Sequence, residues 1–149
     1  MQLILFIGIQ ATGKSSFYRA HFSETHLRLN LDMLKTRHRM DILFHACLES
    51  KTPVLIDNTN LTPGERQSHI MAARAAHYQI VGYYFASNVS LALQRNSSRE
   101  NKTRLPDAAI LGSKKKLVPP SLNEGFDKLY FVQMHGDFSF TTNPWNHEI

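Results

Sequence analysis

Residues 8–16 read GIQATGKSS and follow the apolar run LILFI at residues 3–7. This segment fits G-x-x-x-x-G-K-S/T, in which the glycines let successive backbone N–H groups point inward. Such a ring of donors binds phosphate oxygens when a buried strand precedes it and a helix follows it. Both conditions are met, because residues 2–8 are continuously apolar and a helix is predicted from Lys14 to about Phe22. The segment therefore predicts a loop that binds a nucleoside triphosphate.

Each part of this loop has an expected role toward ATP and its Mg²⁺. Gly8 and Gly13 permit the tight backbone path. Lys14 is expected to bridge the β- and γ-phosphates, and Ser15 to place its hydroxyl on Mg²⁺. The residues predicted to contact the nucleotide in this loop are Gly8, Gln10, Ala11, Thr12, Gly13, Lys14, Ser15 and Ser16.

The rest of the chain alternates between strand-like and helix-like segments. Strands are predicted at residues 2–8, 26–31, 54–57, 79–86 and 129–134, and helices at 14–22, 33–50, 62–77, 89–99 and 106–116. Strands separated by helices indicate a parallel sheet with right-handed crossovers. We predict one α/β domain over residues 1–149, with a five-stranded parallel sheet flanked by helices, and a loosely packed tail after about residue 136.

Composition restricts the setting and the partners. A length of 149 residues favours a single domain, and one cysteine, Cys47, excludes an internal disulfide and suits a reducing compartment. No run approaches the roughly 20 apolar residues of a membrane span, so we expect a cytoplasmic protein that does not insert in membranes. A net charge of +5 favours polyanionic partners, including nucleic acid. The eight histidines show no zinc-ligand spacing, and the oligomeric state is not predicted.

Asp57 ends the predicted strand at residues 54–57, at the sheet edge where ligands bind in α/β proteins. We expect its carboxylate to hold Mg²⁺, directly or through a water. Hydrolytic motors usually place a water-activating glutamate after this acid, whereas Asn58 follows here, which favours phosphate transfer over hydrolysis. The segment at residues 101–104 lacks the aspartate of a guanine-binding motif. The alternative is that Asp57 forms a turn together with Asn58 and Asn60.

Asp32 follows the second predicted strand and so lies at the same edge. A carboxylate near the γ-phosphate takes the proton of an attacking hydroxyl, which makes Asp32 a candidate general base. Alternatively, Asp32 is only the N-cap of the helix predicted at residues 33–50. On a continuous helix, Asp32, Lys35 and Arg39 fall on one face, an arrangement suited to an anionic acceptor.

The basic segment QRNSSRENKTRLP at residues 94–106 predicts a mobile lid. Arg95 and Arg99 are one helical turn apart, and Lys102 and Arg104 follow them. Phosphoryl transfer spreads negative charge over the equatorial oxygens, and an arginine delivered by a lid stabilises that charge. The alternative is a solvated basic helix end that complements the helix dipole.

Several segments together resemble one family. The segments GIQATGKSS, NLDMLK, IDNTNL and QRNSSR, spread from residue 2 to about residue 112, resemble the P-loop kinase domain of the 5′-hydroxyl polynucleotide kinases in order and spacing. They also occur in a broader group of small P-loop kinases. The resemblance implies a P-loop kinase fold with a helical lid, with ATP and Mg²⁺ as cofactors.

The resemblance also implies roles for individual residues. Asp32 corresponds to the base that takes the proton of the acceptor's 5′-hydroxyl, and Arg99 to the lid arginine that clamps the phosphates. Arg95 is implied near the nucleotide, and Asp57 matches the acid of the third strand. Lys35 stands where the family has an arginine for the acceptor's phosphate, and lysine lacks the bidentate fork of arginine.

We therefore expect an ATP-dependent kinase that transfers the γ-phosphate to a hydroxyl, and the acceptor that we expect is the 5′-OH of a nucleic acid or nucleotide. The expected catalytic residues are Asp32, Lys14 and Arg99, the metal ligands Ser15 and Asp57, and the acceptor-binding residues Asp32, Lys35, Arg39 and Asn58. One alternative is a kinase for a small metabolite, which would bind its acceptor with less salt sensitivity than a nucleic acid. Another is an ATP-binding regulator without transferase activity.

Overall fold

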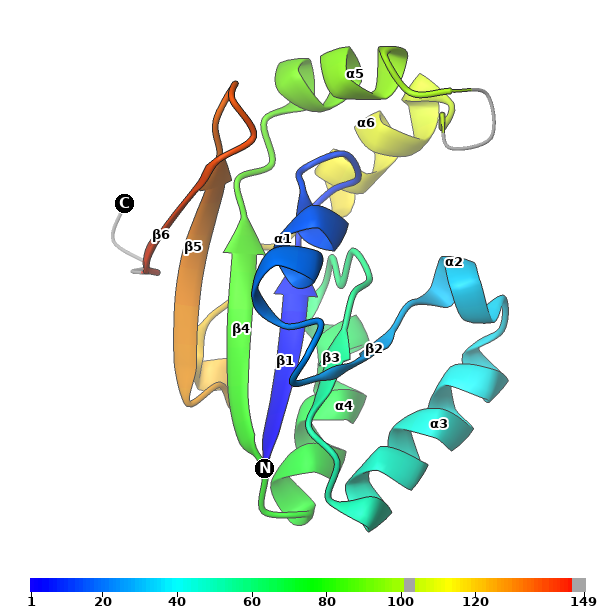
Figure 1. Ribbon diagram of the computed structural model, residues 1–149, viewed down its shortest axis with the longest axis vertical. Coiled ribbons are helices and arrows are strands. Elements are labelled where there is room, and N and C mark those ends of the chain that lie inside the picture. Colours follow the sequence, from blue (N-terminus) through cyan, green and yellow to red (C-terminus); the bar gives the residue numbers. More distant parts are fainter. Residues whose placement is uncertain (101–103, 146–149) are drawn as a thin grey trace.

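A computed structural model describes residues 1–100 and 104–145 of the protein. Its centre is one six-stranded sheet with the order β2-β3-β1-β4-β5-β6 (Figure 1). The strands are β1 (Gln2–Ile7), β2 (Leu27–Leu29), β3 (Val54–Ile56), β4 (Gln79–Phe85), β5 (Lys128–Met134) and β6 (Phe140–Pro144). The first five pair in parallel, which confirms the predicted parallel α/β sheet, whereas β6 pairs antiparallel with β5.

Helices cover both faces of this sheet and its carboxyl edge. They are α1 (Lys14–His21), α2 (Leu31–Leu34), α3 (Arg37–Ser50), α4 (Pro63–Ala75), α5 (Val89–Ser97), α6 (Asp107–Lys116) and the 3₁₀ helix η1 (Leu122–Glu124). On one face Phe17 of α1 packs against Phe6 and Phe85, and on the other Phe44 and Ile70 of α3 and α4 join the main core. Helices α5 and α6 lie beyond the carboxyl ends of β1 and β4 (Figure 1). Among the described helices, none has the length and apolarity needed to cross a membrane.

The sixth strand corrects the sequence prediction of a loose tail. Residues 140–144 pair along β5, and the next residue, Trp145, donates from Nε1 to the carbonyl of Pro120 at 3.0 Å. Its ring packs on Tyr84 with centroids 4.9 Å apart. The strand FTTNP is mostly exposed and shows no apolar alternation, so its structure depends on the partner strand. Residues 146–149 of the predicted tail lie outside the described range.

The helix predicted at residues 33–50 is two helices, which corrects a second expectation. Asn30 caps α2 by accepting from the backbone N–H of Met33 at 3.1 Å. Lys35 then takes a φ of 74°, which no α-helix continues. Thr36 begins α3 by accepting from the N–H of Arg39 at 3.1 Å. The positive φ of Lys35 and the extended backbone of the Thr36 cap therefore divide residues 31–50 into two helices.

This break changes the placement of three predicted acceptor-site residues. Asp32 lies in the first turn of α2, and Asn30 rather than Asp32 is the N-cap. Lys35 ends α2, and Arg39 belongs to the first turn of α3. The prediction that Asp32, Lys35 and Arg39 share one helix face is therefore wrong, because they do not share a helix.

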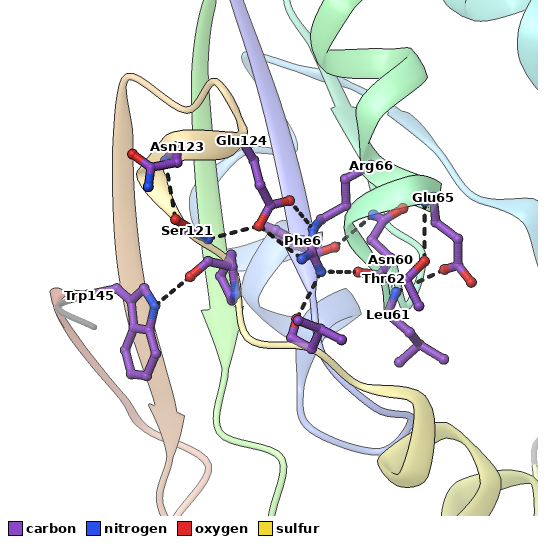
Figure 2. A network of polar contacts seen from close by, with 12 residues as sticks. Phe6, Asn60, Leu61, Thr62, Glu65, Arg66, Ser121, Asn123, Glu124 and Trp145 are labelled. Carbon is purple, nitrogen blue, oxygen red and sulfur yellow. Dashed lines mark hydrogen bonds and ion pairs between the residues drawn. The ribbon is translucent and has the colours of Figure 1, made fainter. Parts of the chain in front are cut away.

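A buried polar network holds the segment after β3 under the phosphate loop (Figure 2). Asn60, at a φ of 46°, donates from Nδ2 to the carbonyl of Phe6 at 2.7 Å. The fully buried Arg66 of α4 donates to the Asn60 carbonyl at 2.8 Å and forms a two-bond ion pair with Glu124. Through these contacts the loop edge is tied to the chain before β5.

Candidate active site

A cavity of about 440 Å³ opens at the carboxyl edge of the sheet, between the phosphate loop, α2, the start of α3 and the lid. The residues that line it are Gln10, Ala11, Thr12, Gly13, Lys14, Ser15, Ser16, Arg19, Asn30, Leu31, Asp32, Arg37, Asp57, Asn58, Thr59, Asn60, Glu65, His69, Arg99 and Leu105. Eleven of these residues are predicted site residues, contributed by segments far apart in the sequence. The cavity therefore brings most of the predicted phosphate, metal and acceptor groups together.

The phosphate loop has the tight backbone path that its glycines predict. Gly13 takes a φ of 92° and immediately precedes α1. A Cβ atom there would lie 2.7 Å from the Met134 sulfur and 2.9 Å from the Phe140 ring. Gly8 does not line the cavity, and its N–H donates to the Thr59 carbonyl at 3.0 Å. Gly8 thus connects the start of the phosphate loop to the segment after β3.

Lys14 folds over its own loop. Its Nζ donates to the carbonyls of Gly8 at 2.9 Å and Ile9 at 2.6 Å. Burial lowers the pKa of Lys14 to about 8, while the Asp57 and Asp32 carboxylates raise this pKa and the Arg99 guanidinium lowers it. The ammonium therefore lies within electrostatic reach of both predicted acids and of the lid arginine.

The two predicted magnesium ligands are in contact. Ser15 Oγ donates to Asp57 Oδ2 at 3.0 Å, and Asp57 is 2% exposed. A hydroxyl and a carboxylate oxygen are the hard donors that Mg²⁺ prefers. Ser15 lies in the first turn of α1 and Asp57 directly follows β3, so the two residues meet beside the phosphate loop and fit the ion. Arg28 of β2 reaches the same two atoms, with Nε 2.8 Å from Asp57 Oδ2 and Nη2 3.0 Å from Ser15 Oγ.

Asp32 and Arg99 lie on the wall of the cavity, whereas Arg95 does not. Arg95 donates to the carbonyls of Ala11 and Met134, each at 3.2 Å, and so links the phosphate loop to the end of β5. Arg95 therefore supports the loop backbone from outside the cavity. Burial lowers the pKa of Arg95.

The lid contains α5 and α6. The buried side-chain amide of Asn96 in α5 joins it to Leu105, which precedes α6. Asn96 donates to the Leu105 carbonyl at 2.7 Å and accepts from the Leu105 N–H at 2.9 Å. This pair fixes the two ends of the segment that carries Arg99. The predicted lid residue Lys102 lies outside the described range, and Arg104 is exposed.

On the acceptor side, the cation that lines the cavity is not one of those predicted. Lys35 and Arg39 are exposed and absent from the cavity wall, and Arg39 donates from Nη1 to the Leu34 carbonyl at 3.2 Å. Arg37, in the first turn of α3, lines the cavity instead. Asn58 lines it as predicted, while its Oδ1 accepts from the Leu31 N–H at 2.9 Å.

A match to a known family covers the part of the chain that forms the cavity. A family model described as AAA domain matches residues 3–120. The chain belongs to this family. The matched range contains the phosphate loop, Asp32, Asp57 and Arg99, so the whole cavity lies within the AAA domain.

Known relatives of this AAA domain include named kinases. The chain is 27% identical, over 97% of its length, to a bifunctional polynucleotide phosphatase/kinase of Schizosaccharomyces pombe, of which it spans 37%. It is 26% identical, over 84% of its length, to an L-seryl-tRNA(Sec) kinase of Methanococcus maripaludis, of which it spans 56%. The chain thus covers less than two thirds of these relatives. The structure of Chaetomium thermophilum Kti12 in complex with ADP-AlF₃ has the same fold, with a TM-score of 0.70, 16% identity and 88% of each chain covered.

Among the residues of this AAA domain that contribute to the site without having been predicted are Arg28, Arg37 and His69. An arginine between two leucines in a short strand was the available signal for Arg28, and the Thr36 cap was the signal for Arg37. His69 of α4 is buried, with an Nδ1 atom that has no hydrogen-bond partner within the described residues. Burial lowers the pKa of His69.

Proposed function

We propose that the protein transfers the γ-phosphate of ATP to the 5′-hydroxyl of a nucleic acid or nucleotide. The observation that carries this proposal is that one cavity contains both the phosphate loop and Asp32. A carboxylate across the cavity from the loop is the arrangement that phosphoryl transfer to a hydroxyl requires. A purely regulatory ATP-binding site would not need it.

In the proposed reaction, the Asp32 carboxylate takes the proton of the acceptor hydroxyl. The hydroxyl oxygen attacks the γ-phosphorus in line, the bond from that phosphorus to the β,γ-bridging oxygen breaks, and ADP leaves. Lys14 and Arg99 stabilise the charge that spreads over the phosphate oxygens. Ser15 and Asp57 would hold Mg²⁺, which supplies neutralisation of the β- and γ-phosphate charge when bound.

The acceptor class rests on three kinds of support. The first is the likeness to the polynucleotide phosphatase/kinase over nearly the whole chain. The second is Arg37, a guanidinium on the acceptor side of the cavity that can grip the phosphate next to a 5′-terminal sugar. The net charge of +5 favours the same polyanionic class.

The test is transfer of label from γ-labelled ATP with Mg²⁺. Acceptors would be single-stranded DNA and RNA oligonucleotides with 5′-hydroxyl ends, and the same oligonucleotides already phosphorylated at the 5′ end would serve as controls. Label on the 5′-hydroxyl ends alone, absent with Lys14→Ala, would support the proposal. ATP binding without label on any oligonucleotide would overturn the acceptor class. Aminoacylated tRNA and small polyols would then be tested as acceptors, since each carries a hydroxyl group.

A further inference from the structure

The guanidinium of Arg28 contacts both of the oxygens that would hold Mg²⁺. Ser15 Oγ and Asp57 Oδ2 are the two oxygens that fit Mg²⁺, and Arg28 donates to both of them, at 3.0 Å and 2.8 Å. Ser15 in turn donates to Asp57 Oδ2 at 3.0 Å, so the three side chains close a triangle. Within the described residues, the cation in direct contact with the nearly fully buried Asp57 carboxylate is therefore Arg28.

The sheet puts Arg28 in this position. Leu29 of β2 points into the main core, so the alternation of the strand sends Arg28 to the opposite face, where α1 begins. Arg28 pairs in register with Leu55, and the Asp57 N–H donates to the Leu29 carbonyl at 2.9 Å. Strand β2 thus holds the arginine beside Asp57 through backbone contacts.

Arg28 also has room to leave. Its side chain is 25% exposed, whereas the Asp57 side chain is 2% exposed. The Tyr18 ring of α1 lies 5.8 Å from the guanidinium, within the range of a cation–π contact. A side chain that is partly exposed and already above an aromatic face can swing away from Asp57 without losing all of its contacts.

We propose that Arg28 is a resident counter-ion that takes the place of the metal in the nucleotide-free protein, and that Mg·ATP and Arg28 compete for Ser15 and Asp57. Binding of Mg·ATP displaces the guanidinium, because a divalent cation and a guanidinium in contact with the same carboxylate oxygen repel each other. ATP without metal leaves Arg28 in place, and its remaining N–H donors then serve the phosphates. Arg28 therefore sets how strongly ATP binding depends on the metal. This inference takes the Mg·ATP ligand from the proposed function and does not depend on the acceptor.

The test is the affinity for ATP, measured by isothermal titration calorimetry in excess Mg²⁺ and in EDTA. We expect Arg28→Gln to weaken metal-free binding about tenfold or more, the worth of one charge-assisted hydrogen bond, and to leave Mg·ATP binding equal or tighter. The ratio of the two affinities then rises at least about tenfold over that of the wild-type protein. An unchanged ratio would overturn the proposal.

Two further variants keep the test decisive. Arg19→Gln removes another arginine that lines the cavity. Within the described residues Arg19 donates to Ser16 and not to Asp57, so this variant measures the general effect of lost positive charge. The ratio for Arg28→Gln must exceed that for Arg19→Gln. If Arg28→Gln does not fold, Arg28→Lys keeps a cation beside Asp57 but not the fork, and its ratio should lie above that of the wild-type protein. The expected ratios with no labelled oligonucleotide would support Arg28 and count against the acceptor.

Discussion

Arg66 and Glu124, which are 58 residues apart, form a two-bond ion pair inside the protein (Figure 2). The Nε–Oε1 distance is 2.7 Å and the Nη2–Oε2 distance is 3.0 Å. Arg66 is 0% exposed, and its Nη1 also donates to the carbonyls of Asn60 and Val118. The guanidinium therefore holds the edge of the cavity to the connection that leads to β5.

Arg66→Ala should lower the free energy of unfolding by about 3 to 5 kcal/mol, because it leaves a part-buried carboxylate and two carbonyls without their donor. Urea unfolding followed by circular dichroism measures this. Arg74→Ala is the matched control, since the Arg74–Asp127 pair is exposed and 3.5 Å apart, and it should cost about 1 kcal/mol or less. Equal losses in the two variants would contradict the structural role of Arg66.

Asp32→Ala should reduce turnover by roughly 10² to 10⁴ while the affinity for ATP stays within a few-fold, because a general base acts in the transition state and not in nucleotide binding. Single-turnover transfer and calorimetry separate the two quantities. Glu49→Ala, which removes an exposed carboxylate from the far end of α3, is the control and should be neutral. Transfer at the wild-type rate with Asp32→Ala would remove Asp32 from the mechanism.

Arg37→Gln should raise the acceptor KM by about tenfold or more with little change in the KM for ATP, because Arg37 lines the cavity on the acceptor side. Lys35→Gln and Arg39→Gln make the same charge change at nearby positions that do not line the cavity, so they should have smaller effects. Steady-state kinetics with an oligonucleotide acceptor measures all three. A larger effect from Lys35 than from Arg37 would refute this assignment.

ATP affinity should fall as pH rises above about 8. Burial lowers the pKa of Lys14 to about 8, so the ammonium is charged below this pH and loses its proton above it. Because the charged form attracts phosphate, the affinity should be level below pH 8 and fall by up to about tenfold per pH unit above it, with proton uptake on binding. Calorimetry in buffers of different ionisation enthalpy detects that proton. Lys14→Ala should remove the uptake, and a flat profile in the wild-type protein would contradict the role of Lys14.

Much of the fold was predictable because its signals are local. The phosphate loop, the Thr62 cap of α4 and the Asn88 cap of α5 each depend on residues a few positions apart. The predicted strand positions were also correct to within one or two residues, because buried parallel strands are continuously apolar.

The acceptor side was predicted less well, because it depends on where one helix stops. Lys35, at a φ of 74°, changes the direction of the chain between α2 and α3. As a result Arg37 lines the cavity and Arg39 does not. Helical periodicity cannot foresee such a break, since Asp32, Lys35 and Arg39 keep their helical spacing in the sequence. The strand β6 was missed for a related reason, because its exposed residues become a strand only by pairing with β5.

The amino-acid sequence alone determined the order of strands and helices, the phosphate loop and the two acids at strand ends, because these follow from short-range patterns of apolarity, glycine and capping residues. The tertiary structure decided which positively charged side chains contact the acidic ones. Arg28 reaches Ser15 and Asp57 only because β2 pairs with β3, and Arg66 reaches Glu124 only because α4 packs near η1. Electrostatic interactions depend on distance in space, and the order of residues along the chain does not give that distance. The partner of Asp57 could therefore be identified only from the tertiary structure.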